Sequence, residues 1–305
     1  MSDICVLGNF VADNSFYADK LPEKGQTIFG KGFQVGPGGK GSNQAIAAAR
    51  LGSKVNFLGK VGDDAHGKMA IDLYKKNKID LKTVFISKEH QTGIAGIMIN
   101  KTDGTNKIIV VPGASMEITI GEVDKFSKLL ENCKVFLTQL EIKTDVTFHA
   151  LKLAKKGKAI TILNPAPAIK IGEDFFKYVD YFTPNETEAE FYFGKKIETY
   201  DQAKEAGDFF IKKGVKNSII TLGDKGIYFT NNKTNFSLPA LDLKGKVVDT
   251  TGAGDAFSGA LASGLGKGMN IDKCLNFAIK ASGISTLKKG AADAMPTLKD
   301  LELLS

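Results

Sequence analysis

Short apolar runs alternate with longer alanine-rich or amphipathic stretches along most of this chain. Ile4–Leu7 is a four-residue apolar run, whereas Gly41–Leu51 is rich in alanine and lacks proline. The first pattern predicts a buried strand and the second a helix. Further strands are predicted at Val55–Leu58, Val135–Leu137, Ile160–Leu163, Tyr181–Thr183, Ser218–Leu222 and Gly226–Thr230. Further helices are predicted at Ala65–Lys76, Asp145–Lys155, Gly172–Tyr178, Ala253–Leu265, Ile271–Thr286 and from Leu298 onward.

Strands that alternate with helices in this way predict an α/β protein, with a mostly parallel sheet covered by helices on both faces. Two regions lack the intervening helices. Residues 16–35 include a looser strand pattern at Thr27–Val35, and Ile94–Asn100 and Lys107–Val111 flank an Asp-Gly pair that favours a hairpin turn. We expect these two regions to form a small separate sheet.

Composition indicates a folded protein with a dispersed charge. Of the 305 residues, 43% are hydrophobic and 25% charged, which is enough apolar material for a core. The 41 basic and 34 acidic residues leave a net charge of +7, without a run of five or six basic residues. An anionic small-molecule substrate therefore fits the charge better than a nucleic acid does.

The cysteines and the N-terminus indicate the cellular compartment in which the protein works. Cys5, Cys133 and Cys274 lie far apart and none belongs to a CxxC pair, which predicts reduced thiols. The N-terminus lacks a basic region followed by an apolar one, and no apolar stretch approaches the ~18 residues that a membrane span needs. We expect a cytoplasmic protein without membrane contact.

The first glycine-rich element lies between a predicted strand and a predicted helix. It matches the dinucleotide-binding pattern G-x-G-x-x-G at Gly36, Gly38 and Gly41. Pro37 stiffens that loop, and the loop follows the second strand-like segment rather than the first, so dinucleotide binding is disfavoured. Lys40 precedes a glycine rather than Ser or Thr, so the P-loop pattern fails as well. Ligand binding and a turn used only for packing both stay open here.

The second glycine-rich element opens an apolar helix after the strand-like Lys246–Val248. Gly252, Ala253 and Gly254 can turn their N–H groups toward one point at the positive end of the helix dipole, which suits a transferring phosphoryl group. Asp255 follows in the first helical turn. It either caps the helix or accepts a proton from an attacking hydroxyl, and its place beside anion donors favours the second role.

These segments carry a family resemblance. Gly38–Gln44 and Asp249–Asp255 resemble the two signatures of the ribokinase family of sugar kinases, and Asn164–Ala168 and Thr183–Glu190 resemble further segments of that family. The resemblance extends from Ile4 to about residue 296 with the motifs in the expected order. It implies a Rossmann-like central sheet in a single α/β kinase domain over residues 1–305, with a β-sheet lid formed by about 13–36 and 92–111.

The resemblance also implies a reaction and its participants. It implies ATP-dependent phosphorylation of a sugar, expected to be ribose, with Mg²⁺ accompanying ATP, potassium as an activator and a homodimer formed through the lid. Asp255 would be the base, and the backbone of Gly252, Ala253, Gly254 and Asp255 would be the anion hole. The implied sugar-binding residues are Asp13, Gly39, Lys40, Asn43, Glu141 and Asp255. The implied nucleotide-binding residues are Asn185, Thr221, Gly223, Gly226 and Gly254. The implied metal-site residues are Glu188 for Mg²⁺ and Asp249, Thr251, Ser285, Lys288 and Gly290 for potassium.

Two positions depart from the family pattern. Val11 stands two residues before Asp13, where ribokinases typically place Asn, so one polar contact to the sugar is missing. Ala294 stands where they often carry Ser near the potassium loop, which predicts a weaker cation site. A kinase for another sugar or a nucleoside is therefore the alternative. A non-enzymatic sensor of sugar or nucleotide is disfavoured by the intact Asp255.

Overall fold

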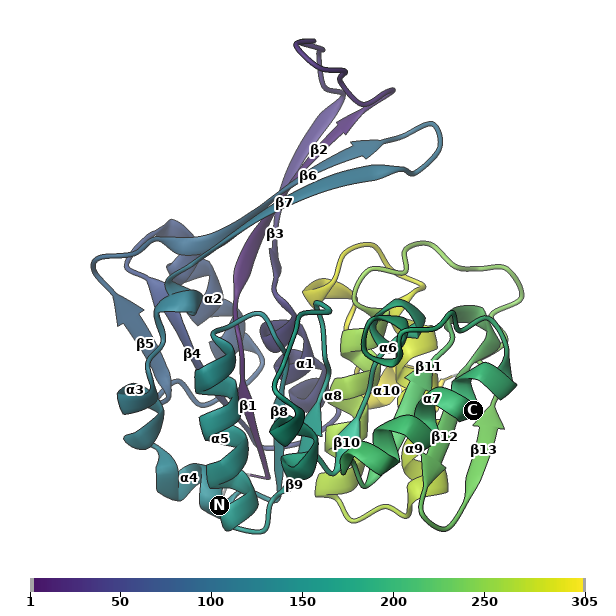
Figure 1. The fold of residues 1–305 in the computed structure, drawn as a ribbon. Coiled ribbons are helices and arrows are strands. Elements are labelled where there is room, and N and C mark those ends of the chain that lie inside the picture. Colours follow the sequence, from purple (N-terminus) through teal and green to yellow (C-terminus); the bar gives the residue numbers. More distant parts are fainter. Residues whose placement is uncertain (1–2, 304–305) are drawn as a thin grey trace.

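The computed structural model describes residues 3–303, and its largest feature is a nine-stranded sheet (Figure 1). Its strands are β1 (Ile4–Leu7), β4 (Val55–Gly62), β5 (Val84–Ser87), β8 (Val135–Thr138), β9 (Ile160–Leu163), β10 (Tyr181–Phe182), β11 (Asn217–Thr221), β12 (Ile227–Asn231) and β13 (Asn235–Leu238). They lie in the order β13-β12-β11-β10-β9-β8-β1-β4-β5. The strands from β5 to β11 pair in parallel, and β12 and β13 continue the sheet antiparallel. The predicted mostly parallel sheet is confirmed.

Helices cover both faces of this sheet (Figure 1). One face packs against α1 (Lys40–Arg50), α2 (Ala65–Lys76), α8 (Ala253–Gly266), α9 (Ile271–Ser285) and α10 (Leu298–Glu302). The other packs against α3 (Ile120–Asp124), α4 (Ser127–Asn132), α5 (Thr144–Lys156), α6 (Glu186–Phe193) and α7 (Tyr200–Lys213). Short 3₁₀ helices are η1 (Ala114–Glu117), η2 (Glu173–Tyr178), η3 (Gly223–Lys225) and η4 (Ala292–Ala294).

Strand β1 explains why the predicted strands are continuous apolar runs. Ile4 and Val6 belong to the core on the α1 and α8 face, and Cys5 and Leu7 belong to the core on the α5 face. Successive side chains of a strand point to opposite faces, so a strand covered on both sides has no position left for a polar residue.

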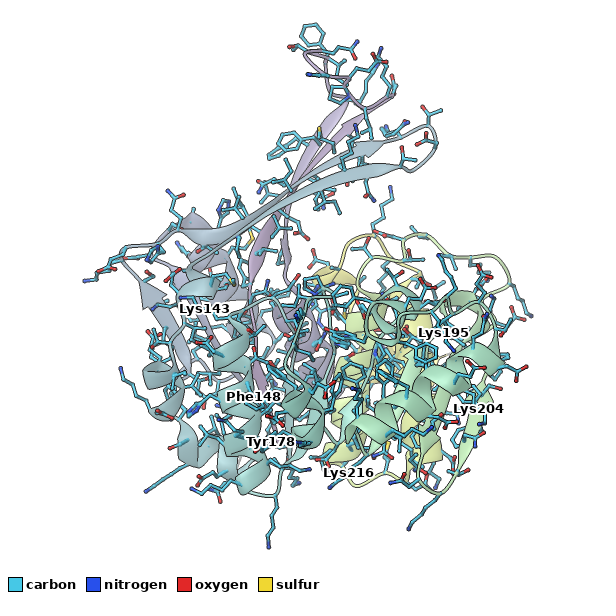
Figure 2. All side chains as sticks on the ribbon, viewed as in Figure 1. Lys143, Phe148, Tyr178, Lys195, Lys204 and Lys216 are labelled. Atoms are coloured by element: carbon cyan, nitrogen blue, oxygen red, sulfur yellow. The ribbon has the colours of Figure 1, made fainter. Side chains whose placement is uncertain are left out.

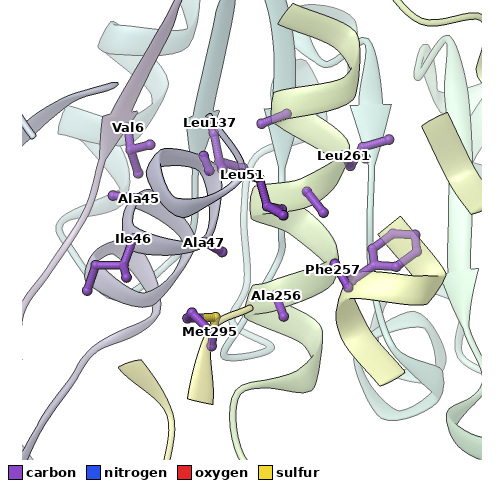
Figure 3. Packing of buried hydrophobic residues seen from close by; sticks show 14 of the residues in the cluster. Val6, Ala45, Ile46, Ala47, Leu51, Leu137, Ala256, Phe257, Leu261 and Met295 are labelled. Atoms are coloured by element: carbon purple, nitrogen blue, oxygen red, sulfur yellow. The ribbon is translucent and has the colours of Figure 1, made fainter. Parts of the chain in front are cut away.

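Helices α1 and α8 pack unusually close to one another (Figure 3). A Cβ on Gly259 of α8 would lie 2.5 Å from the backbone oxygen of Gln44 and 2.6 Å from the Cβ of Ala47, both in α1. Only glycine permits this approach. The contact brings the start of α8 beside the start of α1, and both helix starts carry residues of the predicted site.

The second sheet is the predicted lid, which projects from the main body (Figure 1). Its strands are β2 (Val11–Ala18), β3 (Gly32–Gly38), β6 (Thr92–Asn100) and β7 (Asn106–Gly113), in the order β3-β2-β6-β7. The predicted hairpin is confirmed, with β6 antiparallel to β7 and Gly104 at φ +76° in the turn between them. Residues 27–31 were predicted as strand and are not, since β3 begins only at Gly32.

Another prediction was wrong at Lys246–Val248, which is a loop. Val247 and Val248 are about half exposed, and the N–H groups of Val248 and Asp249 donate to the carbonyl of Thr286 rather than to a strand. A β-branched run gives a strand signal whether or not a partner strand lies beside it, and no strand within residues 3–303 pairs with this run. The stretch predicted as a helix at Gly172–Tyr178 is the 3₁₀ helix η2.

Surface charge is spread over separate elements. Lys143, Lys195, Lys204 and Lys216 lie at the periphery of the main body (Figure 2). Each pairs with a carboxylate: Glu117, Glu205, Asp208 and Asp180 respectively. The three cysteines are free and buried. Among residues 3–303, no helix has the length and apolar character needed to cross a lipid bilayer.

Candidate functional site

A cavity of about 160 Å³ lies where the parallel strands end. Asn164 follows β9, Thr183 follows β10 and Thr221 ends β11, so the cavity sits at the carboxyl edge of the sheet. Open α/β sheets bind ligands at this edge, near the point where the strand order reverses. Here the order reverses around β1, which has β4 on one side and β8 on the other. The lining residues are Lys40, Asn164, Ala166, Thr183, Asn185, Glu188, Thr221, Thr250, Gly252, Ala253, Gly254, Asp255, Phe257 and Ser258.

Asp255 is one of two acidic residues that line this cavity. It lies in the first turn of α8 and is 7% exposed. Its Oδ2 accepts a hydrogen bond from Asn43 Nδ2 and its Oδ1 accepts one from Gln44 Nε2, both at 2.9 Å. Two neighbouring amides of α1 thus hold both carboxylate oxygens, although more than 200 residues separate them from Asp255 in sequence.

The turn before Asp255 has the conformation that an anion receptor needs. Gly252 caps α8 at φ +79°, a left-handed conformation that other residues rarely adopt. The Ala253 N–H donates to the carbonyl of Thr250 at 3.2 Å within the turn. The N–H groups of Gly254 and Asp255 belong to the first helical turn, where no carbonyl of the helix itself can accept them. They are therefore the stronger candidates for binding an anion.

Three carboxylates and one ammonium surround Asp255. The pKa of Lys40 is raised: burial lowers it, but the nearby charges of Asp255, Glu141 and Glu188 outweigh that effect. The backbone N–H of Lys40 also donates to Glu141 Oε2 at 3.0 Å. Burial, and then the repulsion from Glu141 and Asp255, raise the pKa of Asp13 from its ordinary value of 3.8 to about 6.

The other two carboxylates respond to burial in the same direction. Burial raises the pKa of Glu141 and that of Glu188, and Lys40 opposes the shift in both. Negative charge thus exceeds positive charge in a desolvated space. Hydroxyl groups that donate hydrogen bonds would be favoured partners for such a group of acceptors.

The predicted sugar-binding residues come together around this space. Asp13 lies in β2 of the lid, and its carboxylate lies against the Cα of Gly38. A Cβ atom added to Gly38 would be only 2.3 Å from Asp13 Oδ2. Gly39 caps the start of α1, and Asn43 is almost fully buried in that helix. The Oδ1 atom of Asn43 is buried and has no hydrogen-bond partner among residues 3–303.

Asn185 and Glu188 form the start of α6. The Asn185 side chain accepts from the N–H of Glu188 at 2.8 Å, and Glu188 Oε2 accepts from the N–H of Asn185 at 2.9 Å, which is a capping box. Both residues line the cavity together with Thr221. Gly223 and Gly226 do not line it; they lie in the turn after β11, where the N–H of Leu222 donates to the carbonyl of Gly226.

The residues predicted for potassium lie in two loops that Asp249 joins. The Asp249 carboxylate accepts from the N–H groups of Thr251 and Gly290, each at 2.9 Å. Burial acts to raise the pKa of Asp249, and these hydrogen bonds reverse the effect and lower it. The Ser285 hydroxyl donates to the carbonyl of Ser282, and Lys288 Nζ lies 3.6 Å from Asp300, so the side chains of these two residues are occupied elsewhere.

His149 Nε2 lies 2.6 Å from Asp124 Oδ1 at the protein surface. Within residues 3–303, no group of three or more His, Cys, Asp or Glu side chains could hold a metal ion.

Sequence reasoning did not predict a role in the site for the amide side chains of Gln44, Asn164, Gln139 and Asn9. Gln44 contacts three partners: Asp255, Asn164 and Gln139. The Asn9 side chain accepts from the N–H of Gly41 at 3.3 Å and so connects the end of β1 to the start of α1. Gln44 and Asn164 belong to the quoted motifs, so a signal existed, but motif membership alone did not indicate that they meet.

Comparison with known proteins agrees with this architecture. The chain is 35% identical over 303 residues to the ribokinase of Lactococcus lactis, covering 99% of this chain and 96% of that protein. It is 33% identical over 300 residues to the deoxyribokinase of Salmonella typhi, covering 97% and 96%. The structure of Arabidopsis thaliana ribokinase complexed with ribose and ATP superposes with a TM-score of 0.92 at 32% identity, covering 99% and 98%. The profile of the pfkB family of carbohydrate kinases matches residues 1–298, and this chain belongs to that family.

Proposed function

We propose that this carbohydrate kinase transfers the γ-phosphoryl group of ATP to the 5-hydroxyl of D-ribose, with Asp255 as general base. The observation that carries the proposal is the buried Asp255 carboxylate, held by two amides beside the first N–H groups of α8. Asp255 accepts the hydroxyl proton as the sugar oxygen forms its bond to the γ-phosphorus. The bond from that phosphorus to the bridging oxygen breaks, and ADP leaves with the electron pair.

The backbone at the start of α8 supplies the complementary charge. The N–H groups of Gly254 and Asp255 lie at the positive end of the helix dipole, where the transferring group carries its negative charge. Gly252 and Ala253 shape the turn that presents them. The Lys40 ammonium interacts with the charge of Asp255, and in our proposal it offsets the charge of the reacting groups.

The sugar is bound by Asp13, Gly39, Lys40, Asn43 and Glu141 in this proposal. Asp13 and Glu141 accept hydrogen bonds from sugar hydroxyls, and the buried Oδ1 of Asn43 accepts one more. A buried acceptor without a partner costs roughly 1–3 kcal/mol, so a sugar that supplies the missing donor is selected over one that does not.

ATP would bind along the edge that carries Asn185 and Thr221, with Gly223 and Gly226 in the adjoining turn. Mg²⁺ is usually held by one or two carboxylates together with nucleotide phosphates and water, and Glu188 is a carboxylate that lines the cavity. A potassium ion would bind between the loops joined by Asp249, close to Thr251 and with carbonyl oxygens of Ser285, Lys288 and Gly290. This all-oxygen set suits a hard cation, which neutralises charge near the anion hole when bound.

A deoxysugar is the second candidate substrate, and Val11 is the observation that favours it. Val11 lies two residues before Asp13 in β2, on the same face of the strand, and is 5% exposed. Its side chain has no hydrogen-bonding atom. A sugar with a hydrogen in place of one hydroxyl would lose nothing at this position.

We also propose that the whole chain works as one kinase domain and pairs with a second copy through the lid, in the cytoplasm. The apolar side chains of Ile108, Ile109, Val110 and Val111 on β7 are each about half or more exposed. Contiguous exposed apolar residues are typical of an interaction surface. The free, buried thiols suit a reducing compartment.

The test is a coupled assay of ADP formation with ribose, 2-deoxyribose, nucleosides and ketohexoses, applied to the wild type and to Asp255→Asn. We expect sugar-dependent turnover, and a fall in kcat of at least ~10²-fold in Asp255→Asn with ATP and sugar binding retained. Asp272→Asn is the matched control, because Asp272 is an exposed acid in the first turn of α9. If Asp255→Asn and the control have similar kcat, Asp255 only caps its helix and the proposal fails.

A further inference from the structure

The Gln44 side chain forms a hydrogen-bonded cluster with three other buried polar side chains, but it does not line the cavity. It is fully buried in α1. Its Nε2 donates to Asp255 Oδ1 at 2.9 Å and to Asn164 Oδ1 at 3.0 Å, and its Oε1 accepts from Gln139 Nε2 at 2.6 Å. A carboxamide has two N–H donors and one oxygen, so all of its hydrogen-bonding groups are in use.

The direction of each hydrogen bond in this network is determined by groups that can only accept a hydrogen bond. Asn164 Nδ2 donates to the backbone carbonyl of Thr183 at 2.9 Å. A carbonyl only accepts, so the oxygen of Asn164 has to face Gln44. The Asp255 carboxylate also only accepts when ionised. Gln44 Nε2 therefore lies between two acceptors, and turning its amide over would place an oxygen against each of them.

Gln139 fixes the other side of the same amide. Its Nε2 donates to Gln44 Oε1, whereas its own Oε1 is buried and has no hydrogen-bond partner in the described part of the chain. That oxygen lies close to Gly8: a Cβ atom added to Gly8 would be only 2.4 Å from it. An unpaired buried oxygen is unfavourable, and leucine would fill a similar volume without it. The contribution that the Gln139 amide makes is thus its bond to Gln44.

We propose that Gln44 is a positioning residue that orients the Asp255 carboxylate toward the sugar hydroxyl, with Gln139 and Asn164 holding Gln44 in the required orientation. The inference rests on the proposed role of Asp255 as base. A carboxylate can rotate about its χ2 angle, and a base has to point at the proton that it accepts. Asn43 holds one oxygen from the side of α1 that carries the sugar-binding residues, and Gln44 holds the other.

The network also joins two parts of the site. Thr183 follows β10 and lies two residues before Asn185, the N-cap of α6. The chain of amides thus runs from the proposed nucleotide and metal edge, through Asn164 and Gln44, to the base. The close packing of α8 against α1 at Gly259 accompanies the bond from Gln44 to Asp255.

The test compares Gln44→Leu, Gln139→Leu and the double variant. In Gln44→Leu, Asp255 loses one donor, and we expect kcat to fall by about 10- to 100-fold, as for one hydrogen bond to a charged group. KM for ribose and for ATP should change by less than about threefold, because Gln44 contacts neither substrate in the proposed site. In Gln139→Leu the bond from Gln44 to Asp255 is kept, and kcat should fall by only about two- to fivefold.

The double variant separates positioning from stability. Gln44→Leu alone leaves the Gln139 amide wholly unpaired and should lower Tm by several degrees, whereas the double variant replaces both partners with apolar groups and should recover much of that loss. Its kcat should stay as low as that of Gln44→Leu. A kcat that recovers together with Tm would show that Gln44 is only structural, and the inference would be wrong.

A pH profile gives the second readout. The other charged groups that face Asp255 are Lys40, Asp13, Glu141 and Glu188, and they are the same in all variants. If Gln44 positions the base, the loss of kcat persists on the high-pH plateau of the profile, near about pH 9. A return to the wild-type rate there would overturn the inference. Wild-type kcat in Gln44→Leu beside an inactive Asp255→Asn would reject the inference alone, whereas an active Asp255→Asn would reject the proposed function.

Discussion

The backbone N–H of Lys40 donates to Glu141 Oε2 at 3.0 Å, a bond that joins the start of α1 to the loop after β8 across 101 residues of sequence. It brings the Glu141 charge into the space that Asp13 and Asp255 also face. The resulting repulsion, added to burial, raises the pKa of Asp13 to about 6. The sugar site is therefore assembled at a cost to the stability of the protein without its substrate.

Asp13→Asn tests that cost. The folded-state pKa of Asp13 lies above its ordinary value of 3.8, so the charged form destabilises the fold at neutral pH and the neutral form does not. The penalty is complete above about pH 6 and absent below the ordinary value. We expect Asp13→Asn to raise the free energy of unfolding by roughly 1–3 kcal/mol near pH 8 and to leave it unchanged near pH 3.5, while raising KM for ribose.

Urea unfolding of both proteins at the two pH values measures this difference. Asp19→Asn is the matched control, since Asp19 follows the same strand and is exposed in an ion pair with Lys31. A gain in stability that is equal at both pH values would show that the repulsion is not its cause.

The potassium proposal makes a separate prediction. At matched ionic strength, the wild type should turn over faster in KCl than in NaCl, by a modest factor because Ala294 offers no side-chain oxygen. Asp249→Asn should abolish the difference, since the loops that Asp249 joins lose both the charge and an acceptor for backbone N–H groups. The control is Asp242→Asn, whose carboxylate also accepts a backbone N–H, from Lys244, in an exposed loop.

Initial rates of turnover in KCl and in NaCl test the potassium proposal. Equal wild-type rates would remove the cation from the proposal, and an unchanged potassium response in Asp249→Asn would place the cation at another site.

The sequence predicted the elements whose signals are local. The apolar runs of β1 and β9, the hairpin of β6 and β7 and the helix α2 have the predicted type and nearly the predicted bounds, because burial on both faces and an Asp-Gly turn leave direct traces in composition. The strand at Lys246–Val248 failed for the complementary reason: strand formation needs a partner strand, and no local pattern reports one.

The same distinction holds for the site. Asp255 could be proposed from sequence because its anion donors precede it in the same turn. Gln44 and Gln139 could not, because their roles depend on contacts 95 and 211 residues apart. The raised pKa of Asp13 could not be predicted either, since it depends on burial and on the charges of Glu141 and Asp255, which the loop after β8 and the start of α8 bring close to the lid.

Val11 governs the last prediction, which concerns the choice of sugar. It pairs with Gly38 and Gly93 in the lid sheet. A Cβ atom added to Gly93 would be 2.9 Å from the Cγ1 atom of Val11. Asn is close to Val in size and could be accommodated with a small adjustment. It would add a donor and an acceptor on the face of β2 that carries Asp13, and Val offers neither.

Val11→Asn should therefore lower KM for ribose with little change in kcat, because the added contact is made in the ground state and the transition state alike. One hydrogen bond to a hydroxyl is worth roughly 1–3 kcal/mol when its absence leaves a buried group unpaired, which corresponds to about 5- to 150-fold in affinity. For 2-deoxyribose, a sugar without that hydroxyl, KM should stay unchanged or rise. The measurement is kcat and KM for both sugars in both proteins, with Val35→Asn on the exposed neighbouring strand β3 as control. An unchanged ribose KM together with an unaltered preference between the two sugars would mean that position 11 does not contact the substrate.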